Sequence, residues 1–415
     1  MPTYLTPGVY VEEIPSSSKP IEGVGTSVAA FVGLAPGGPI NIPMRVSSWP
    51  QFERLYTEPA EPDAGPYVSG GYLAHAVYGF FQNGGSYCWV VKTGGSGQSE
   101  RKPVALSEGL AALADIRSIS IVCAPDISAS SDELGDASPD EFVHTLVEHC
   151  EAAGNRVAIL DPPTALSPDD LLDWRANVAG DDSASATLYY PWIEVMDPLS
   201  EQPMLVPPSG HAAGVWARTA NTWGAHRAPS DATVLGARRV GFEVGDEDRE
   251  HLDGAGVNTI RASSARGIRV WGARTLSSDP EWRYVNVRRT FIYIAESIEK
   301  GTRWAVFQPS DEELWSQLRS SISTFLTRAW SEGALCGASP DEAFYVKCDA
   351  ETNPPDGIEA GRVVVEIGVA PLRPAEFVVF EIRQFTAGAS EADLREASPK
   401  PGWPSTVRRG VRAGS

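Results

Sequence analysis

The sequence has no long apolar run and no recognisable targeting segment. Its 415 residues contain no uninterrupted apolar stretch of about 18 residues, the length that a membrane-spanning helix needs, so we expect no membrane insertion. The N-terminus lacks a basic stretch followed by an apolar one, which is the pattern of a secretory signal. We therefore expect the protein to be assembled in the cytoplasm.

Cysteine is scarce, and its spacing fits no metal site. None of the five cysteines stands in the short paired spacing of zinc ligands, so we predict no metal and expect reduced, buried thiols. Segment 33–38 is rich in glycine but lacks the Lys-Ser/Thr pair of a phosphate-binding loop, so no cofactor is predicted. The cysteines are Cys88, Cys123, Cys150, Cys336 and Cys348.

Basic residues are outnumbered by acidic ones. Lys and Arg total 34 against 54 Asp and Glu, which gives a formal net charge of −20. Such a charge opposes direct binding of nucleic acid and favours a partner with basic patches. With 42% hydrophobic and 21% charged residues, the chain has the composition of a globular protein, and its length allows two or three domains.

The clearest pattern in the sequence is one long amphipathic helix, expected over 311–330. Ser310 and Glu313 have the spacing of a capping box at its start. Gly333 suits the end of the helix, because glycine adopts left-handed dihedral angles without steric cost. Apolar residues recur at helical spacing along one face: Leu314, Trp315, Leu318, Ile322, Phe325, Leu326, Ala329 and Trp330.

Three strands are predicted after this helix, over 344–348, 363–369 and 377–382. In each of them, β-branched and aromatic residues recur with the period of two that is typical of a strand. A helix packed on a small antiparallel sheet makes a self-sufficient α+β core.

Helices and strands alternate in the middle of the chain, between residues 104 and 194. This alternation predicts a parallel sheet with crossover helices. Residues 190–275 are expected to be rich in loops. The helices are predicted over 48–53, 72–81, 106–114, 139–153 and 168–178, and the strands over 28–32, 87–91, 118–123, 156–160 and 186–193.

The same alternation occurs in many enzymes, so an α/β enzyme built on residues 104–194 is the alternative hypothesis. Asp126 and Asp161 follow predicted strands directly, where α/β proteins place ligands. However, His144 and His149 are not spaced to stack on one helix face, and no serine stands in a nucleophile elbow. We therefore assign no catalytic residue.

Aromatic residues in segment 190–223 leave a third possibility open. Tyr190, Trp192, Trp216 and Trp223 occur there among proline and glycine residues. A monomeric carbohydrate-binding module could use such loops. It would bind its ligand saturably and would not assemble.

Both ends of the chain are predicted to be arms. Near the N-terminus, one short strand precedes a linker rich in proline and serine, residues 15–20. A lone strand cannot close a sheet, so it needs a partner later in the chain or in another chain. Residues 397–415 carry basic residues and no acidic one, which is typical either of a disordered tail or of an arm that docks on an acidic neighbour. The strand residues are Val9, Tyr10, Val11, Glu12 and Glu13, and the basic residues are Lys400, Arg408, Arg409 and Arg412.

Four segments together resemble one known family. They are 6–14 (TPGVYVEEI), 271–276 (WGARTL), 284–309 (YVNVRRTFIYIAESIEKGTRWAVFQP) and 344–349 (FYVKCD). They are similar to segments of the contractile tail sheath proteins. The resemblance covers both ends of the chain and is weak between about 100 and 185.

The resemblance implies an α/β plus α+β fold in four parts. An outer α/β domain, 23–265, would be inserted between an N-terminal arm, 1–22, and a C-terminal α+β sheath core domain, 266–388. This core domain would hold a small antiparallel sheet and one long helix. The basic extension, 389–415, would complete the chain.

The resemblance also implies a structural function. Sheath subunits polymerise into a helical sleeve around an inner tube, and the sleeve contracts to drive the tube through a target membrane without catalysing a reaction. The implied partners are further copies of the chain, the inner tube protein, and baseplate and cap proteins. The C-terminal domain would face the tube, with Arg319 and Arg328 as candidate contacts.

The sequence also favours one kind of contractile particle over another. The chain lacks large inserted surface domains, which favours an extracellular-type contractile injection system or another phage-tail-like particle over a phage. Such a particle can be released from the cell.

Overall fold

The computed structural model describes residues 19–94, 103–128, 139–177, 182–263 and 265–375. All of these except Ala375 belong to the first of two compact units, Met1–Pro374 and Ala375–Ser415. The predicted arm strand, the predicted strand over 377–382 and the basic tail lie outside the described residues.

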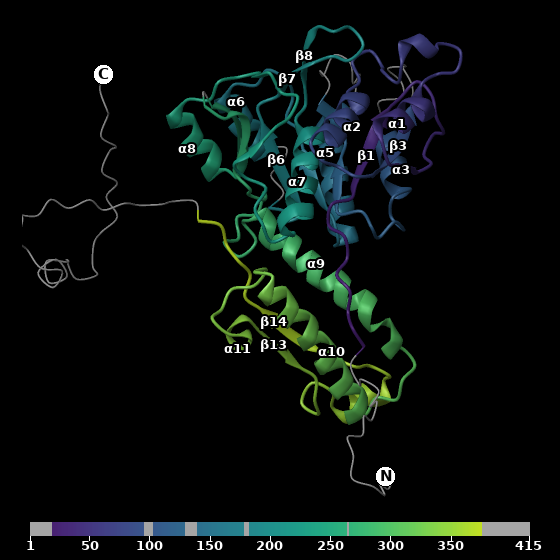
Figure 1. The fold of residues 1–415 in the computed structure, drawn as a ribbon, viewed down its shortest axis with the longest axis vertical. Coiled ribbons are helices and arrows are strands. Elements are labelled where there is room, and N and C mark those ends of the chain that lie inside the picture. The colour runs from purple at the N-terminus through teal and green to yellow at the C-terminus, as the bar shows by residue number, and fades with distance from the viewer. Residues whose placement is uncertain (1–18, 95–102, 129–138, 178–181, 264, 376–415) are drawn as a thin grey trace, which may run out of the picture. The chain divides into compact units, whose positions relative to one another are not determined.

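A nine-stranded sheet, called the large sheet below, forms the centre of this unit (Figure 1). Its strand order is β2-β3-β1-β4-β5-β6-β11-β12-β9. The pairs from β3 to β11 are parallel, whereas β2, β12 and β9 join antiparallel at the edges. The predicted parallel sheet is confirmed. The strands are β1 Ala29–Leu34, β2 Met44–Val46, β3 Cys88–Gly94, β4 Ile121–Cys123, β5 Val157–Leu160, β6 Ala186–Tyr190, β9 Ala232–Thr233, β11 Val257–Ser263 and β12 Gly267–Trp271.

Helices cover both faces of the large sheet. They are α1 Trp49–Tyr56, α2 Leu73–Gln82, α3 Pro103–Ala111, α5 Pro139–Ala153, α6 Pro168–Asn177, α7 Ser209–Trp223 and α8 Asp246–Gly254. Alternate residues of β1 point to opposite faces: Ala29 and Phe31 pack in one core cluster with α2 and α7, and Ala30 and Val32 pack in another with α3 and α5. A strand buried on both faces needs a continuous apolar run, which is what the sequence has there.

The loop-rich assignment of 190–275 is wrong. Helix α7 lies in this region and packs closely on α2, because Gly210 has no side chain: a Cβ there would lie 2.3 Å from the Cα of Ala76. The predicted strand over 186–193 is also divided, at the cis peptide Tyr190–Pro191. A second sheet follows, in the order β10-β7-β8, with β7 Ile193–Met196, β8 Pro203–Val206 and β10 Arg239–Val240.

Two long helices occur in the C-terminal part, where the sequence predicted one. Helix α9, Val285–Thr302, precedes the predicted one, α10, Glu312–Ser331. Helix α9 joins two cores, since Val285 and Ile292 pack in a cluster of the large sheet and Ile294 packs with α10 (Figure 1). The remaining elements are α11 Pro340–Ala343, β13 Phe344–Lys347, α12 Pro355–Glu359 and β14 Glu366–Val369.

The caps of α10 differ in part from the prediction. Asp311, not Ser310, is the N-cap, and its side chain accepts a hydrogen bond from the Leu314 amide at 2.9 Å. The end is as predicted: Gly333 has a φ of +81°. The Gly333 amide donates to the Trp330 carbonyl and the Ala334 amide to the Ala329 carbonyl, both at 2.9 Å, which is the pattern of a Schellman motif.

Two further expectations concern cysteines and domain limits. Cys336 is exposed, so the expectation that every cysteine is buried is wrong for this residue, whereas the other four are buried. Strand β12 pairs with β11 in the large sheet, although residues 266–388 were assigned to the C-terminal domain. The four domain limits stay a prediction, because strand pairing does not show which segments fold independently.

Candidate functional site

The small sheet, formed by β13 and β14, has only two strands among the described residues. Phe344 and Val346 oppose Val369 and Ile367 on the face that packs against the apolar side of α10. The other face is open, with Tyr345 53% exposed. A two-stranded ribbon is marginally stable at best without further strands or a helix behind it.

Among the residues that the structure describes, the edges of the small sheet have few backbone partners. Within residues 265–375, its register is extended by a bond from the Ala370 amide to the Ala343 carbonyl, at 2.8 Å, by a bond from the Cys336 amide to the Ala370 carbonyl, at 2.8 Å, and by a bridge between Leu335 and Pro371. All three lie at the end of β14. Open edges of this kind can accept a strand from another chain.

The arm root, which we define as residues 19–28, runs along α10 before it enters the large sheet. The Lys19 amide donates to Ser321 Oγ at 3.1 Å, and Arg328 Nη2 donates to the Ile21 carbonyl at 2.9 Å. The Ile21 side chain is 3% exposed and belongs to the core cluster of α10. The N-terminal segment therefore leaves the described part of the chain beside α10.

The arm root then passes α9, which bonds its next residues. The Val24 amide donates to Ser297 Oγ at 3.1 Å, and Arg289 Nη2 donates to the Thr26 carbonyl at 2.7 Å. Arg289 is 2% exposed, and its guanidinium lies 4.9 Å from the ring centre of Trp216 in α7. Burial lowers the pKa of Arg289 to about 10, so the group stays charged at neutral pH.

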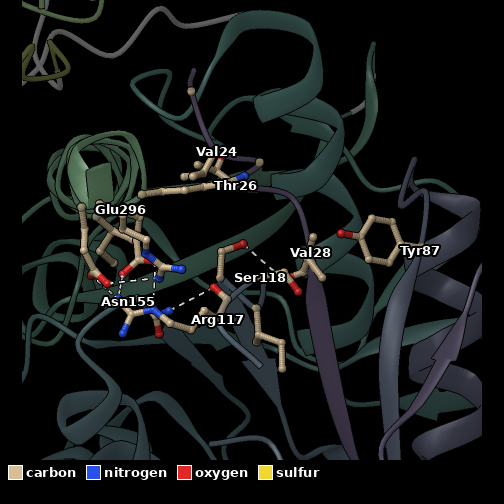
Figure 2. Close-up of a pocket in the computed structure, with 16 residues that line it drawn as sticks. Val24, Thr26, Val28, Tyr87, Arg117, Ser118, Asn155 and Glu296 are labelled. Carbon is tan, nitrogen blue, oxygen red and sulfur yellow. Dashed lines mark hydrogen bonds and ion pairs between the residues drawn. The ribbon is translucent and has the colours of Figure 1, made fainter. Parts of the chain in front are cut away.

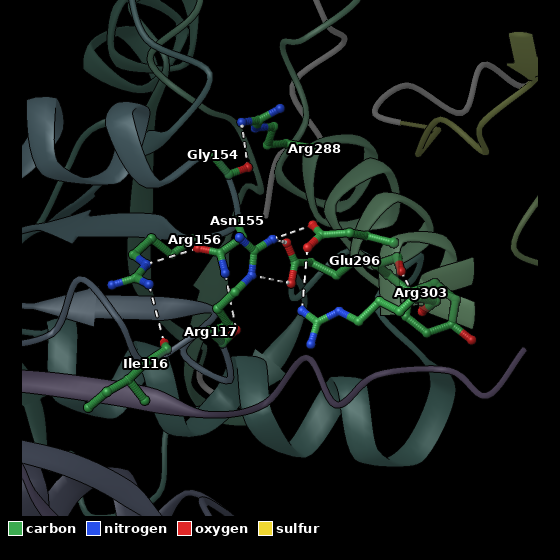
Figure 3. Close-up of polar contacts among 11 residues, drawn as sticks. Ile116, Arg117, Gly154, Asn155, Arg156, Arg288, Glu296 and Arg303 are labelled. Atoms are coloured by element: carbon green, nitrogen blue, oxygen red, sulfur yellow. Dashed lines mark hydrogen bonds and ion pairs between the residues drawn. The ribbon is translucent and has the colours of Figure 1, made fainter. Parts of the chain in front are cut away.

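A second set of polar contacts connects α9 with the loop before β4 (Figure 3). Arg117 forms ion pairs with Glu296 and Glu299 of α9, and the hydrogen bond to Glu296 is the main cause of the raised pKa of Arg117. The Arg117 carbonyl accepts from Asn155 Nδ2 at 3.1 Å. The buried Arg156 holds the same loop, with Nη2 donating to the Ile116 carbonyl at 3.2 Å.

A groove of about 360 Å³ lies between the arm root and this loop. Val24 and Thr26 line one side, and Arg117 and Ser118 the other (Figure 2). Helix α9 closes the groove with side chains of both charges, including Glu296. Nothing in this mixed lining selects one class of ligand.

The two arginines predicted to contact a tube both have partners within the subunit. Arg319 bonds Glu312 at 2.8 Å and the carbonyl of Cys348, and Arg328 bonds the arm root. The tube contact of these arginines stays a prediction. The other predicted site residues, in the arm strand and the basic tail, lie outside the described residues, so their contacts also stay a prediction.

The two carboxylates on which an enzyme could depend bind helix N-termini instead. Asp126 accepts from the amides of Leu34, at 2.6 Å, and of Tyr72 and Leu73 at the start of α2. Asp161 accepts from the amide of Ser209, the first residue of α7, at 2.8 Å. Negative charge is stabilised at such positions, so both side chains have a structural role that needs no substrate.

Burial affects a carboxylate and a histidine of this region. It raises the pKa of Asp161 to about 7 and lowers the pKa of His211, near the start of α7, to about 4. Within the described part of the chain, no three His, Cys, Asp or Glu side chains are arranged to hold a metal ion. Within those same residues, no helix has the length and hydropathy of a membrane span.

Two family models match most of the chain. The phage tail sheath protein central domain matches residues 102–276, and the phage tail sheath C-terminal domain matches residues 277–385. Together they extend without a gap from the start of α3 to beyond the small sheet.

Sequence relatives agree with these models. A protein named as a putative prophage major tail sheath protein, from Pseudomonas aeruginosa strain UCBPP-PA14, is 28% identical over 251 residues, which are 59% of this chain and 62% of the relative. The tail sheath protein of Enterobacteria phage T4 is 22% identical over 252 residues, 58% of this chain and 37% of the relative. The chain thus matches less than two thirds of the length of either relative.

Solved structures match over more of the chain. The helical sheath of the anti-feeding prophage in its contracted state aligns with a TM-score of 0.73 and 26% identity, covering 92% of this chain and all of the other. The contracted sheath of an extracellular contractile injection system, PVC, aligns with a TM-score of 0.72 and 27% identity. The alignment covers 93% of this chain and 99% of the other.

Proposed function

Because this chain belongs to the phage tail sheath protein family, we propose that it is the sheath subunit of a contractile, phage-tail-like injection system. Many copies would polymerise into a helical sleeve around an inner tube. Contraction of the sleeve would drive the tube through a target membrane. The similarity to two contracted sheaths over at least 92% of the chain is the observation that carries this proposal.

Polymerisation would use the open edge of the small sheet. The arm strand, Val9–Glu13, precedes an arm root that is fixed beside α10, and it would pair with the small sheet of a neighbouring copy. Main-chain hydrogen bonds would give affinity without a broad rigid interface. Since a head-to-tail contact that does not close generates an open helix, one such bond per subunit would suffice to continue the sleeve.

Contraction in this proposal is a change of packing and includes no chemical step. Work would come from the free-energy difference between two arrangements of the same subunits. The alternative, an α/β enzyme, has no support from the comparisons, and its best carboxylates, Asp126 and Asp161, bond to helix N-termini.

The partners follow from the same proposal. We expect the inner tube, a baseplate and a cap as partners, with no direct binding of nucleic acid, and we expect assembly in the cytoplasm before release of the particle. The core domain, residues 266–388, would face the tube, with Arg319 and Arg328 as candidate contacts. The basic tail, including Arg408 and Arg412, would dock on a neighbouring acidic subunit.

Co-expression of the full chain with its inner tube protein would test this function. Negative-stain microscopy of the purified material should show tubes with a regular helical repeat, in extended and contracted forms. The tube protein expressed alone is the control, because it should give only thin tubes without a sleeve. Discrete globules at every protein concentration would contradict the proposal.

A further inference from the structure

We propose that side chains of α9 and α10 anchor the arm root, and that this anchor makes the N-terminal arm a taut connection between neighbouring subunits. The inference rests on the proposed sheath function and adds to it the residues that hold the arm. It also gives Arg328 a role within the subunit, at the base of the arm.

Four side chains of α9 and α10 bond the arm root, at residues 19, 21, 24 and 26. The bonded groups of the root are the Lys19 amide, the Ile21 carbonyl, the Val24 amide and the Thr26 carbonyl. Each bond joins residues that are 263 to 307 positions apart in the sequence. Among the described residues, backbone bonds to the root begin only at Val28, whose carbonyl accepts from the Ser120 and Ile121 amides, so between Lys19 and Thr26 these side chains replace the ladder that would otherwise hold an extended segment. Their donors and acceptors are Ser297, Ser321, Arg289 and Arg328.

The two arginines supply the charge-assisted bonds of the anchor, which are stronger than neutral ones. Arg289 is 2% exposed, yet its Nε and Nη1 groups have no hydrogen-bond partner in the described part of the chain. Burying a guanidinium with unpaired donors is costly. The bond to Thr26 and the stacking on Trp216 are the contacts that offset this cost.

Apolar packing adds a fifth point of attachment. Ile21 lies against α9 at Gly301, where a Cβ would come within 2.7 Å of the isoleucine side chain. Helix α9 therefore has a glycine where the Ile21 side chain packs on it. A larger residue there would push the root away from the helix.

Because the groove leaves one side of the arm root open, the root depends on the anchor to stay in place. Residues 23–26 face α9 on one side and the 360 Å³ groove on the other, so the root is held mainly from one side. Release of the eight residues 19–26 would give each arm up to about 26 Å of free chain, at roughly 3.3 Å per extended residue. With that slack, rotation of one subunit would no longer pull on the next.

Hydrogen–deuterium exchange on the free subunit tests the anchor itself. The test variant is Ser297→Ala with Ser321→Ala and Arg328→Met, and a second variant carries the two serine changes alone. The control is Thr324→Ala with Thr327→Ala, whose hydroxyls donate only to carbonyls of their own helix. We expect the Lys19 and Val24 amides to exchange at least tenfold faster in the triple variant than in the control, with less acceleration in the double variant. Equal rates in all three proteins would overturn the inference.

Contraction of assembled particles tests the consequence. Sheaths of the double variant, which keeps both arginines, should break into short or partly contracted lengths on triggering, whereas control sheaths should contract along their whole length. Intact contraction despite fast exchange at Lys19 and Val24 would also overturn the inference. Failure of the wild-type chain to form any sleeve would contradict the proposed function, while the exchange result would still report on the anchor.

Discussion

The large-sheet region and the small-sheet region differ in how completely they are closed. Nine strands form the first, helices cover both of its faces, and the antiparallel edge strands β2 and β9 have only three and two residues. The second has two strands, an exposed Tyr345 and open edges among the described residues. Short edge strands protect a sheet against further pairing, and open edges invite it. Among the described residues the first region is closed on itself, and the function we propose assigns completion of the second to a strand from a neighbouring copy.

Deletion of residues 1–18 should give the largest effect, and it separates the two regions most clearly. The truncated chain keeps the anchor from Lys19 onward, so its melting temperature should stay within a few degrees of wild type. It lacks the strand that would complete a neighbour's small sheet, so long sheaths should be abolished. Calorimetry and electron microscopy provide the two measurements. Sheaths of normal length from this protein would show that the small sheet does not need the arm.

A substitution in the closed region should do the reverse and lower stability. Trp216→Ala removes a side chain that is 0% exposed, in which Nε1 donates to Tyr189 Oη at 2.8 Å. We expect a loss of about 3–5 kcal/mol in the free energy of unfolding, the usual cost of deleting a buried aromatic side chain. Trp223→Ala, on the same helix but 66% exposed, is the matched control and should change it little. Equal losses for the two variants would mean that burial of Trp216 in the large-sheet core does not stabilise the protein.

The elements that the sequence predicted well have local signals. The predicted helix over 168–178 is α6, and Ser167 caps its start, with the Asp170 amide donating to Ser167 Oγ at 3.2 Å. Helix α7 was missed because Gly210 and Gly214 are typical of loops, and only close packing on α2 explains a helix there. Local propensity is overridden where two helices meet this closely.

The arm root could not be predicted in the same way. Its four bonds to side chains of α9 and α10 join residues more than 260 positions apart, and Ser297 and Ser321 look like ordinary helix residues. The sequence identified Arg328 as a charged position on α10 but gave no reason to connect it with Ile21. Such contacts depend on how the arm root packs beside α9 and α10, and no short sequence motif indicates that packing.

Acid should affect the closed region, because all six histidines of the sequence lie before residue 252. His211 has its usual pKa near 6.5 when unfolded and about 4 when folded, so its contribution to stability is lost as the pH falls from 6.5 to 4. Asp161 opposes this loss. The folded carboxyl binds its proton near pH 7 and the unfolded one near 3.8, so its contribution rises as the pH falls.

Asp161→Asn should therefore reveal the loss of stability that His211 causes at low pH. The variant should assemble normally at pH 7, since the carboxamide oxygen of the new side chain can still accept from the Ser209 amide. Between pH 7 and 4 it should lose about 3 kcal/mol more stability than wild type, because one pKa unit corresponds to about 1.4 kcal/mol. Denaturant unfolding at both pH values measures the difference. Parallel pH profiles for the two proteins would show that the Asp161 carboxyl does not titrate in this window.

The smallest effect is expected where the two regions meet. Arg117 is half exposed and pairs with Glu296 and Glu299 of α9, and exposed ion pairs contribute about 0–1 kcal/mol. Arg117→Met should therefore lower the unfolding free energy by less than about 1 kcal/mol at low salt, and by less still at about 1 M salt, where the Debye length is about 3 Å. Because α9 contributes Val285 to one core and Ile294 to the other, the thermal transition should stay single. Arg303→Met is the control, since this residue pairs with Glu299 on its own helix. A variant that unfolds in two separate steps would show that the ion pairs, rather than the shared helix, couple the closed region to the open one.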